Sequence, residues 1–211
     1  YSTTDPTPTI AEGATKYANG SGTGTFSESI GSLDVNTTYY YNSYAINSAG
    51  TSYGTASQFT TLKLSQTITF GALPTKTYGD ADFAPGATAS STLTVTYSSS
   101  NTDVATIVTG KIHIVGAGTC TIYADQAGNE TYYAASQESQ SLTINKATPT
   151  VNTWPTAAGI TYGEALSSAT LTGGNATVGG SFAYDDNTIT PDAGTYSAAV
   201  TFTPTDASNY N

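Results

Sequence analysis

Residues 112–124 read Ile-His-Ile-Val-Gly-Ala-Gly-Thr-Cys-Thr-Ile-Tyr-Ala, two alternating runs on either side of a glycine-containing turn. Side chains of a β-strand point to opposite faces in turn, so each run is typical of a strand that buries one face. Similar runs recur at about ten-residue intervals, separated by Gly, Asn and Ser. They lie at residues 66–70, 93–97, 104–107 and 141–145. The pattern predicts a small antiparallel β-sandwich over residues 62–146.

The composition favours an all-β protein and excludes several functions. Only 9% of the residues are charged, whereas Thr, Ser, Gly, Tyr and Asn are abundant and Met is absent, which suits strands and polar turns. The formal charge is −10 with only 5 Lys and Arg residues, so we expect no nucleic-acid or anionic-membrane partner. No apolar run approaches the roughly 20 residues of a membrane helix, so we expect no membrane insertion in this segment.

Residues 33–61 predict strands joined by a hairpin. Residues 39–45 alternate between two faces as one long strand, and Asn-Ser-Ala-Gly at 47–50 predicts the turn into a last strand. Leu33 lies six residues before Tyr39, the arrangement of a tyrosine corner, in which the phenol hydroxyl bonds to the upstream backbone. This segment resembles the fibronectin type III domains of bacterial extracellular proteins. The resemblance implies a partial domain over residues 1–61 whose first strands are missing.

Three short motifs carry a second resemblance. They are Tyr-Ser-Ser-Ser-Asn at 97–101, Val-Ala-Thr-Ile at 104–107 and Ala-Gly-Thr at 117–119. Together they make residues 62–146 similar to bacterial immunoglobulin-like domains of the invasin and intimin type. Thr-Tyr-Gly-Asp at 77–80 adds a resemblance to the repeat domains of large bacterial adhesins.

Residues 147–211 repeat features of the preceding segment in the same order, which indicates tandem repetition. The correspondences are Thr-Tyr-Gly-Glu at 161–164 with 77–80, Ala-Gly-Thr-Tyr at 193–196 with Ala-Gly-Thr-Cys at 117–120, and Ser-Asn-Tyr at 208–210 with residues 129–132. Gly118 and Gly194 are therefore expected to be structural turn residues. The closing strand at 141–145 has no counterpart, so we expect a related immunoglobulin-like repeat that lacks its last strand.

The joints between these segments are short and contain no run of Gly or Ser. Residues 61–64 and 145–150 are too few and too ordinary in composition to act as flexible coils of useful reach. We therefore expect tandem sandwiches arranged as a semi-rigid rod.

Catalytic side chains are scarce, and we expect no enzyme. One His and one Cys do not assemble a zinc site or the usual Ser-His and Cys-His machinery. His113, between two isoleucines, is expected to face solvent, and Cys120 to be a small buried strand residue. Trp154 is expected to fill the core of residues 147–211 or their joint with the preceding segment. Four lysines are interpreted as polar strand or edge positions, with a self-formed Lys–Asn crosslink as the alternative: Lys63, Lys76, Lys111 and Lys146.

Paired carboxylates are the only candidates for a metal site. Asp80 with Asp82, and Asp185 with Asp186 beside Asn187, could supply the oxygen ligands that Ca²⁺ prefers. Neither group has the Asp-x-Asp-x-Asp-Gly spacing of a calcium loop, so solvated turn residues are the first interpretation and calcium is the alternative. We expect no other cofactor.

Tyrosines are the candidates for a ligand surface. Tyr40 and Tyr44 face away from the row of Tyr39 and Tyr41 in the expected strand, and an exposed pair of rings could stack on sugars. Cross-strand aromatic pairing that stabilises the sheet is the competing interpretation.

The resemblances together imply a stalk or adhesin segment of a large secreted protein at the bacterial cell surface. Its partners would be other domains of the same long chain and, through adhesion, surface glycans, a host or a substratum. Two alternatives remain open. One is a carbohydrate-binding or spacer segment of a secreted polysaccharide-degrading enzyme. The other is a strand-exchanging filament or surface-layer subunit.

Overall fold

The computed structural model describes residues 1–211 and is all-β. Strands account for 36% of the residues, and the one helical element is a single 3-10 turn, η1 (Leu166–Ser168), so the expected all-β class is confirmed. No helix has the length and apolarity to span a membrane. The chain divides into two compact units, which are described separately. Unit 1 comprises Tyr1–Ile68, Thr88–Thr94 and Gln126–Ser136, and unit 2 comprises Thr69–Ala87, Val95–Asp125 and Gln137–Asn211.

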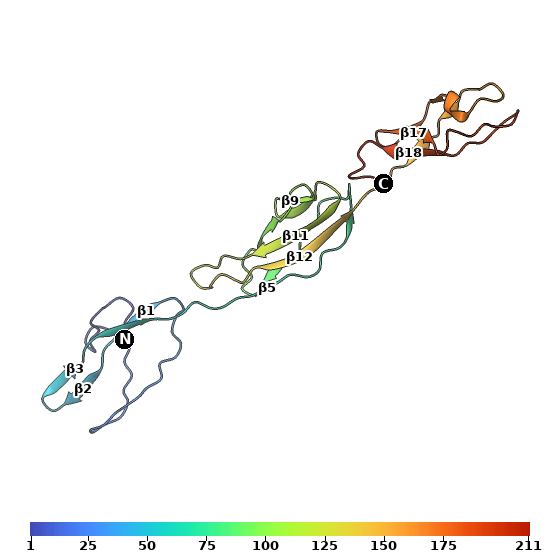
Figure 1. Ribbon diagram of the computed structural model, residues 1–211. Helices are drawn as coiled ribbons and strands as arrows, with labels where there is room; N and C mark the ends of the chain where they lie inside the picture. Colours follow the sequence, from blue (N-terminus) through green and yellow to red (C-terminus); the bar gives the residue numbers. More distant parts are fainter. The chain divides into compact units, whose positions relative to one another are not determined.

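Unit 1 contains two short antiparallel pairs. Strand β1 (Thr38–Tyr41) pairs with β4 (Ser57–Thr60), and β2 (Tyr44–Asn47) pairs with β3 (Gly50–Tyr53), as Figure 1 shows. Asn47 lies opposite Gly50, so the hairpin predicted at 47–50 is confirmed, with two residues in its loop.

The single long strand predicted at 39–45 is wrong, because the chain breaks after β1. Asn42 and Ser43 belong to no strand, and the Ser43 carbonyl instead accepts a hydrogen bond from the Gly54 amide at 2.9 Å. The residues on either side of the break pair with different partners, β4 and β3. An alternating pattern shows which face a residue occupies, but it does not show where a strand changes partner.

A four-stranded sheet dominates the first part of unit 2. Its order is β6–β12–β11–β8, in which β6 (Lys76–Thr77) runs parallel to β12 (Glu138–Asn145) and the other pairs are antiparallel. The remaining members are β11 (Gly118–Asp125) and β8 (Thr96–Ser99), and β11 and β12 lie side by side in Figure 1.

The core of this part is made by alternate residues of three strands. The hairpin of β9 (Ala105–Val108) and β10 (Lys111–Ile114) buries Ile112 completely, and β11 and β12 do the same with Ile122 and Leu142. These are the largest fully buried side chains of the chain. The period-two pattern at 112–124 therefore predicted the buried face correctly.

The second part of unit 2 has smaller, two-stranded sheets. They are β13 (Val151–Thr153) with β16 (Asn175–Ala176), β14 (Thr156–Ala157) with β15 (Leu171–Thr172), and β17 (Gly180–Tyr184) with β18 (Val200–Pro204). The pair β17–β18 brings Phe182 opposite Phe202, with ring centroids 5.0 Å apart. Strands β5 (Ile68–Thr69) and β7 (Thr88–Ala89) form one more two-stranded sheet, in which β7 belongs to unit 1.

Trp154 does not fill the core of residues 147–211, which was the first of the two places expected for it. The side chain is 56% exposed and meets Phe182 edge-on at 5.9 Å. Because Phe182 already packs on Phe202, the indole ring lies over the outside of this aromatic pair.

Candidate functional site

The repeated Thr-Tyr-Gly-acid motif forms the same turn twice in unit 2. In the first copy the Asp80 amide donates to the Thr77 carbonyl at 3.0 Å, and the Asp80 carboxylate accepts from the Thr77 amide at 3.0 Å. Gly79 has a φ of +91°, a conformation that glycine adopts without a steric cost. The Asp80 side chain therefore caps its own turn.

The second copy has matching bonds. The Glu164 amide donates to the Thr161 carbonyl at 3.0 Å, the Thr161 amide donates to the Glu164 carboxylate at 2.7 Å, and Gly163 has a φ of +92°. The sequence similarity between 77–80 and 161–164 thus corresponds to one hydrogen-bonded structure.

A second repeated element is a parallel backbone bridge. In unit 1 the Leu64 amide donates to the Thr131 carbonyl at 2.8 Å, and the Leu64 carbonyl accepts from the Tyr133 amide at 2.9 Å. The Lys63 ammonium adds a bond to the Asn129 carbonyl at 2.8 Å.

Unit 2 contains the corresponding bridge at Ala147. Its amide donates to the Asn209 carbonyl and its carbonyl accepts from the Asn211 amide, both at 2.9 Å. Lys146 bonds to the Ala207 carbonyl at 2.5 Å. These bonds of Lys63 and Lys146 were not predicted from the sequence, where the only signal is that each lysine directly precedes the bridging residue.

Tyr39 and Leu33 lie at the start of β1 in unit 1. The Tyr39 side chain is 3% exposed, and its hydroxyl accepts a hydrogen bond from the Asp34 amide at 2.8 Å. Leu33 is half-buried. The phenol therefore bonds to the backbone five residues upstream.

Gly118 and Gly194 both have positive φ angles, +145° and +126°. A Cβ atom at Gly118 would lie 3.0 Å from the Val104 side chain, whereas a Cβ at Gly194 would meet nothing within 4 Å. Backbone conformation favours glycine at both positions, and close packing adds a second requirement only at Gly118.

Asp82 lies beside the only histidine. The Asp82 carboxylate is 2.8 Å from His113 Nδ1, because an antiparallel bridge between Phe83 and Ile112 places the two side chains opposite each other. Both side chains are substantially exposed, so His113 faces solvent as predicted. Exposed pairs of this kind contribute about 0–1 kcal/mol. The contact between the two residues could not be predicted from the sequence, since it depends on a long-range bridge.

Asp185 and Asp186 bind different threonines. The Thr201 hydroxyl donates to Asp185 at 2.6 Å, while Asp186 accepts from the Thr188 amide at 2.9 Å and from its hydroxyl at 2.6 Å. The bonds from Thr188 lower the pKa of the Asp186 carboxyl below its ordinary value. No group of three or more His, Cys, Asp or Glu side chains gathers at one place with the geometry to hold a metal ion.

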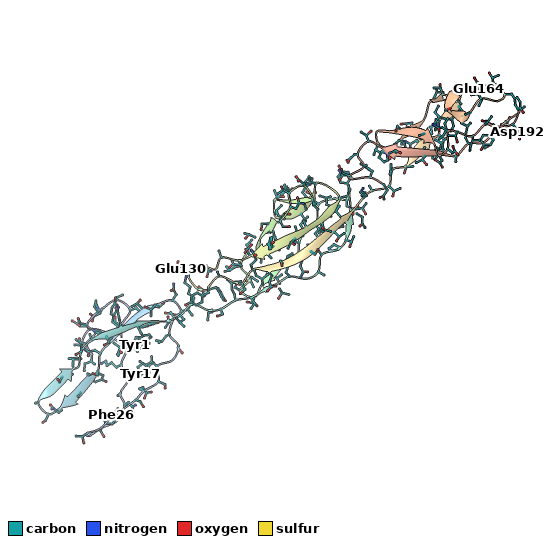
Figure 2. All side chains as sticks on the ribbon, in the orientation of Figure 1. Tyr1, Tyr17, Phe26, Glu130, Glu164 and Asp192 are labelled. Atoms are coloured by element: carbon teal, nitrogen blue, oxygen red, sulfur yellow. The ribbon has the colours of Figure 1, made fainter.

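A small cavity in unit 1 is rich in tyrosine. It has a volume of about 190 Å³, and its lining includes Tyr1, Tyr17, Tyr41, Tyr44 and Tyr53. Tyr1 stacks on Tyr17 with ring centroids 6.2 Å apart, and both rings are labelled in Figure 2. The structure thus groups Tyr44 with Tyr41 and Tyr53, while Tyr40 is outside the lining.

A larger cleft lies in the second part of unit 2. Its volume is about 640 Å³, and two stretches that belong to no strand, 158–162 and 191–199, form much of its wall. Leu166, Leu171 and Tyr184 lie on other sides of it. Figure 2 shows Glu164 and Asp192 at the same end of this region.

No protein family, curated protein or solved structure matches this chain. Repetition within the chain is therefore the relationship on which a functional proposal can rest. The repeated features are the acid-capped turn and the parallel bridge with its lysine.

Proposed function

We propose that residues 1–211 are a non-enzymatic structural and adhesive segment of a large secreted protein of the bacterial cell surface. The segment would consist of tandem immunoglobulin-like sandwiches over residues 1–61, 62–146 and 147–211 that form a semi-rigid stalk. Its partners would be neighbouring domains of the same chain and the surface to which the cell attaches.

The observation that carries this proposal is the repetition of hydrogen-bonded structure. Residues 77–80 and 161–164 share one turn, and Leu64 and Ala147 share one bridge with a lysine on the preceding residue. Stalks and adhesins commonly consist of similar β-domains in series, whereas a catalytic site needs a unique arrangement of side chains.

Surface labelling of cells that make the protein tests the proposal. An antibody raised against residues 62–146 should label intact cells, and its Fab fragment should reduce attachment of these cells to a solid surface. Labelling that appears only after the cells are permeabilised would contradict the surface location. A Fab that labels intact cells but leaves attachment unchanged would restrict the segment to a structural role.

A second candidate function is carbohydrate binding, and the tyrosine-lined cavity of unit 1 favours it. Five tyrosines around one small cavity offer rings on which sugars could stack. In a polysaccharide-binding assay, Tyr41→Ala should weaken retention by several-fold, whereas Tyr133→Ala, an exposed tyrosine outside this cavity, should not. Equal retention of the wild-type chain and Tyr41→Ala would remove this candidate.

A further inference from the structure

Strand β12 makes three kinds of contact in its own sheet. It pairs antiparallel with β11, where Ile144 lies opposite Gly118 and Leu142 opposite Cys120. It pairs parallel with β6, and its Asn145 carbonyl accepts the Tyr78 amide at 2.9 Å. Its apolar side chains at alternate positions are almost fully buried. The strand thus closes a core and satisfies backbone groups on both sides.

The repeated motifs show which residues correspond to the neighbours of β12. Thr161 corresponds to Thr77, so residues 160–161 take the place of β6. Gly194 corresponds to Gly118, so residues 194–200 take the place of most of β11. Both stretches line the 640 Å³ cleft. The second stretch contributes Gly194, Thr195, Tyr196, Ala198 and Val200 to the lining.

Side chains of residues 194–200 are more exposed to solvent than the corresponding side chains of β11. Tyr196 is 47% exposed, whereas Cys120, at the corresponding position of β11, is 6% exposed. Ala198 and Val200 are only half-buried, whereas Ile122 and Ala124 of β11 are fully buried. One face of residues 194–200 is therefore the equivalent of a buried strand face.

Some backbone groups along the cleft have no hydrogen-bond partner, although the Thr161 amide and carbonyl both bond to Glu164. Residues 194–198 make no backbone–backbone hydrogen bond, and the Tyr162 amide has no partner corresponding to the one that β12 gives Tyr78. Unpaired N–H and C=O groups on two segments that line one cleft are what an added strand would bind.

The charge of this region restricts what could bind there. Residues 147–211 contain five carboxylates and no Lys or Arg: Glu164, Asp185, Asp186, Asp192 and Asp206. Asp192 is part of the cleft wall. Positive side chains on an incoming segment are therefore favoured by the local field.

We propose that the cleft is an acceptor site for an extended peptide strand from outside residues 1–211. The peptide runs parallel to residues 160–162 and antiparallel to residues 194–200. Its alternate apolar side chains enter the cleft, and a Lys or Arg at each end lies in the acidic surroundings. The closest sequence in this chain to such a peptide is β12 followed by Lys146.

The test uses the 211-residue chain and a fluorescent peptide that copies residues 138–146 with Glu138→Lys. A matched control has the same composition but exchanges Leu142 with Thr143 and Ile144 with Asn145, which moves the apolar side chains to the other face of the strand. The first peptide should bind at least about tenfold more tightly than the control, because two apolar side chains lose their burial in the control. The unmodified Glu138 peptide should bind more weakly, and added salt should reduce that difference.

A cleft variant and hydrogen exchange locate the binding. Tyr196→Lys should abolish binding of the basic peptide, while Tyr133→Lys, an exposed tyrosine of unit 1, should leave it unchanged. Because Tyr196 is exposed, its replacement is not expected to unfold the chain. Bound peptide should slow amide exchange at residues 160–162 and 194–200 and leave residues 118–124 unchanged.

Three results would overturn the proposal. The first is equal binding of the two peptides, and the second is protection at 118–124 in place of 194–200, which would mean exchange with β12. The third is no peptide binding together with dimers, seen by sedimentation, that Tyr196→Lys abolishes; the occupant would then be a second copy of the chain. None of these results depends on whether the protein reaches the cell surface.

Discussion

Tyr39 fixes the start of β1 through a single hydroxyl group. The ring is buried against Tyr1 and Phe59, with centroids 5.3 and 5.7 Å away, and the hydroxyl accepts the Asp34 amide. This bond is only partly buried, and an ordinary hydrogen bond contributes about 0.5–1.5 kcal/mol to stability. The hydroxyl therefore contributes separately from the packing of the ring.

Replacement of Tyr39 by Phe should lower the free energy of unfolding of unit 1 by about 0.5–1.5 kcal/mol, since it removes the acceptor and keeps the ring. Urea denaturation followed by tyrosine fluorescence measures this change. Tyr41→Phe is the control, because the ring is on the same strand and its hydroxyl makes no hydrogen bond. If both variants were equally stable, the hydrogen bond to Asp34 would make no net contribution.

Cys120 is a buried thiol on β11. Burial raises its pKa above the ordinary value, and a hydrogen bond with Ser99 partly offsets this effect. Because the folded-state pKa is raised, the folded chain holds this proton more strongly than the unfolded chain. The associated stability is fully present below the unfolded pKa and is lost as the pH rises through the folded pKa.

The Cys120 thiol should react with iodoacetamide at pH 8.5 at least about tenfold more slowly in the folded chain than in denaturant. The reason is that only an exposed thiolate reacts. Mass spectrometry of the alkylated protein gives both rates. A Cys120→Ser, Ser98→Cys double variant carries an exposed thiol on the neighbouring strand and should react rapidly in the folded state. Equal folded-state rates for Cys120 and this control would contradict the burial.

Local alternation predicted single residues correctly within an unbroken strand, but not across the break between Tyr41 and Tyr44, which line the same cavity. His113 faces solvent and Cys120 is buried because both follow the period-two pattern of their strands. The contact of His113 with Asp82 could not be predicted, since 31 positions of sequence separate the two residues. The core position expected for Trp154 is wrong for a similar reason, since it depends on a contact between distant residues. Phe182 and Phe202 pack on each other and leave the indole ring outside.

At the scale of elements, the acid-capped turn is the most regular feature. Its two copies have glycines with φ angles of +91° and +92°. A Cβ atom at either glycine would contact no other atom within 4 Å, so the only cost of a side chain there is backbone strain. Strain of this kind costs about 1–2 kcal/mol for a residue other than glycine.

Gly79→Ala and Gly163→Ala should each lower stability by about 1–2 kcal/mol, and the two losses should be similar. Thermal unfolding followed by circular dichroism provides the comparison. Gly71→Ala and Gly159→Ala are matched controls, because their Cβ positions are also open and their φ angles are not positive. A loss at only one of the two turns would show that they are not energetically equivalent.

Short strands limited what the sequence could predict about elements. The hairpin at 47–50 was predictable because turn residues separate two runs that pair with each other. The break after Tyr41 was not, since it depends on β1 and β2 having different partners. The parallel pairing of β6 with β12 joins residues about seventy positions apart, and no local pattern indicates it.

At the scale of the whole chain, the sequence shows that motifs are repeated, but it predicts only some of the structural features that the copies share. The matched motifs predicted corresponding turns, but the lysine bonds of the two bridges were found only in the structure. The walls of the cleft come from several segments between residues 155 and 200, so no local sequence pattern predicted it.

The proposed stalk requires the segment to resist tension through folded β-structure. Single-molecule stretching of the chain between two marker domains tests this requirement most directly. We predict a discrete unfolding event for residues 62–146, with a length gain of up to roughly 30 nm at about 3.6 Å per residue. Smooth extension with no unfolding event from this segment would contradict the account.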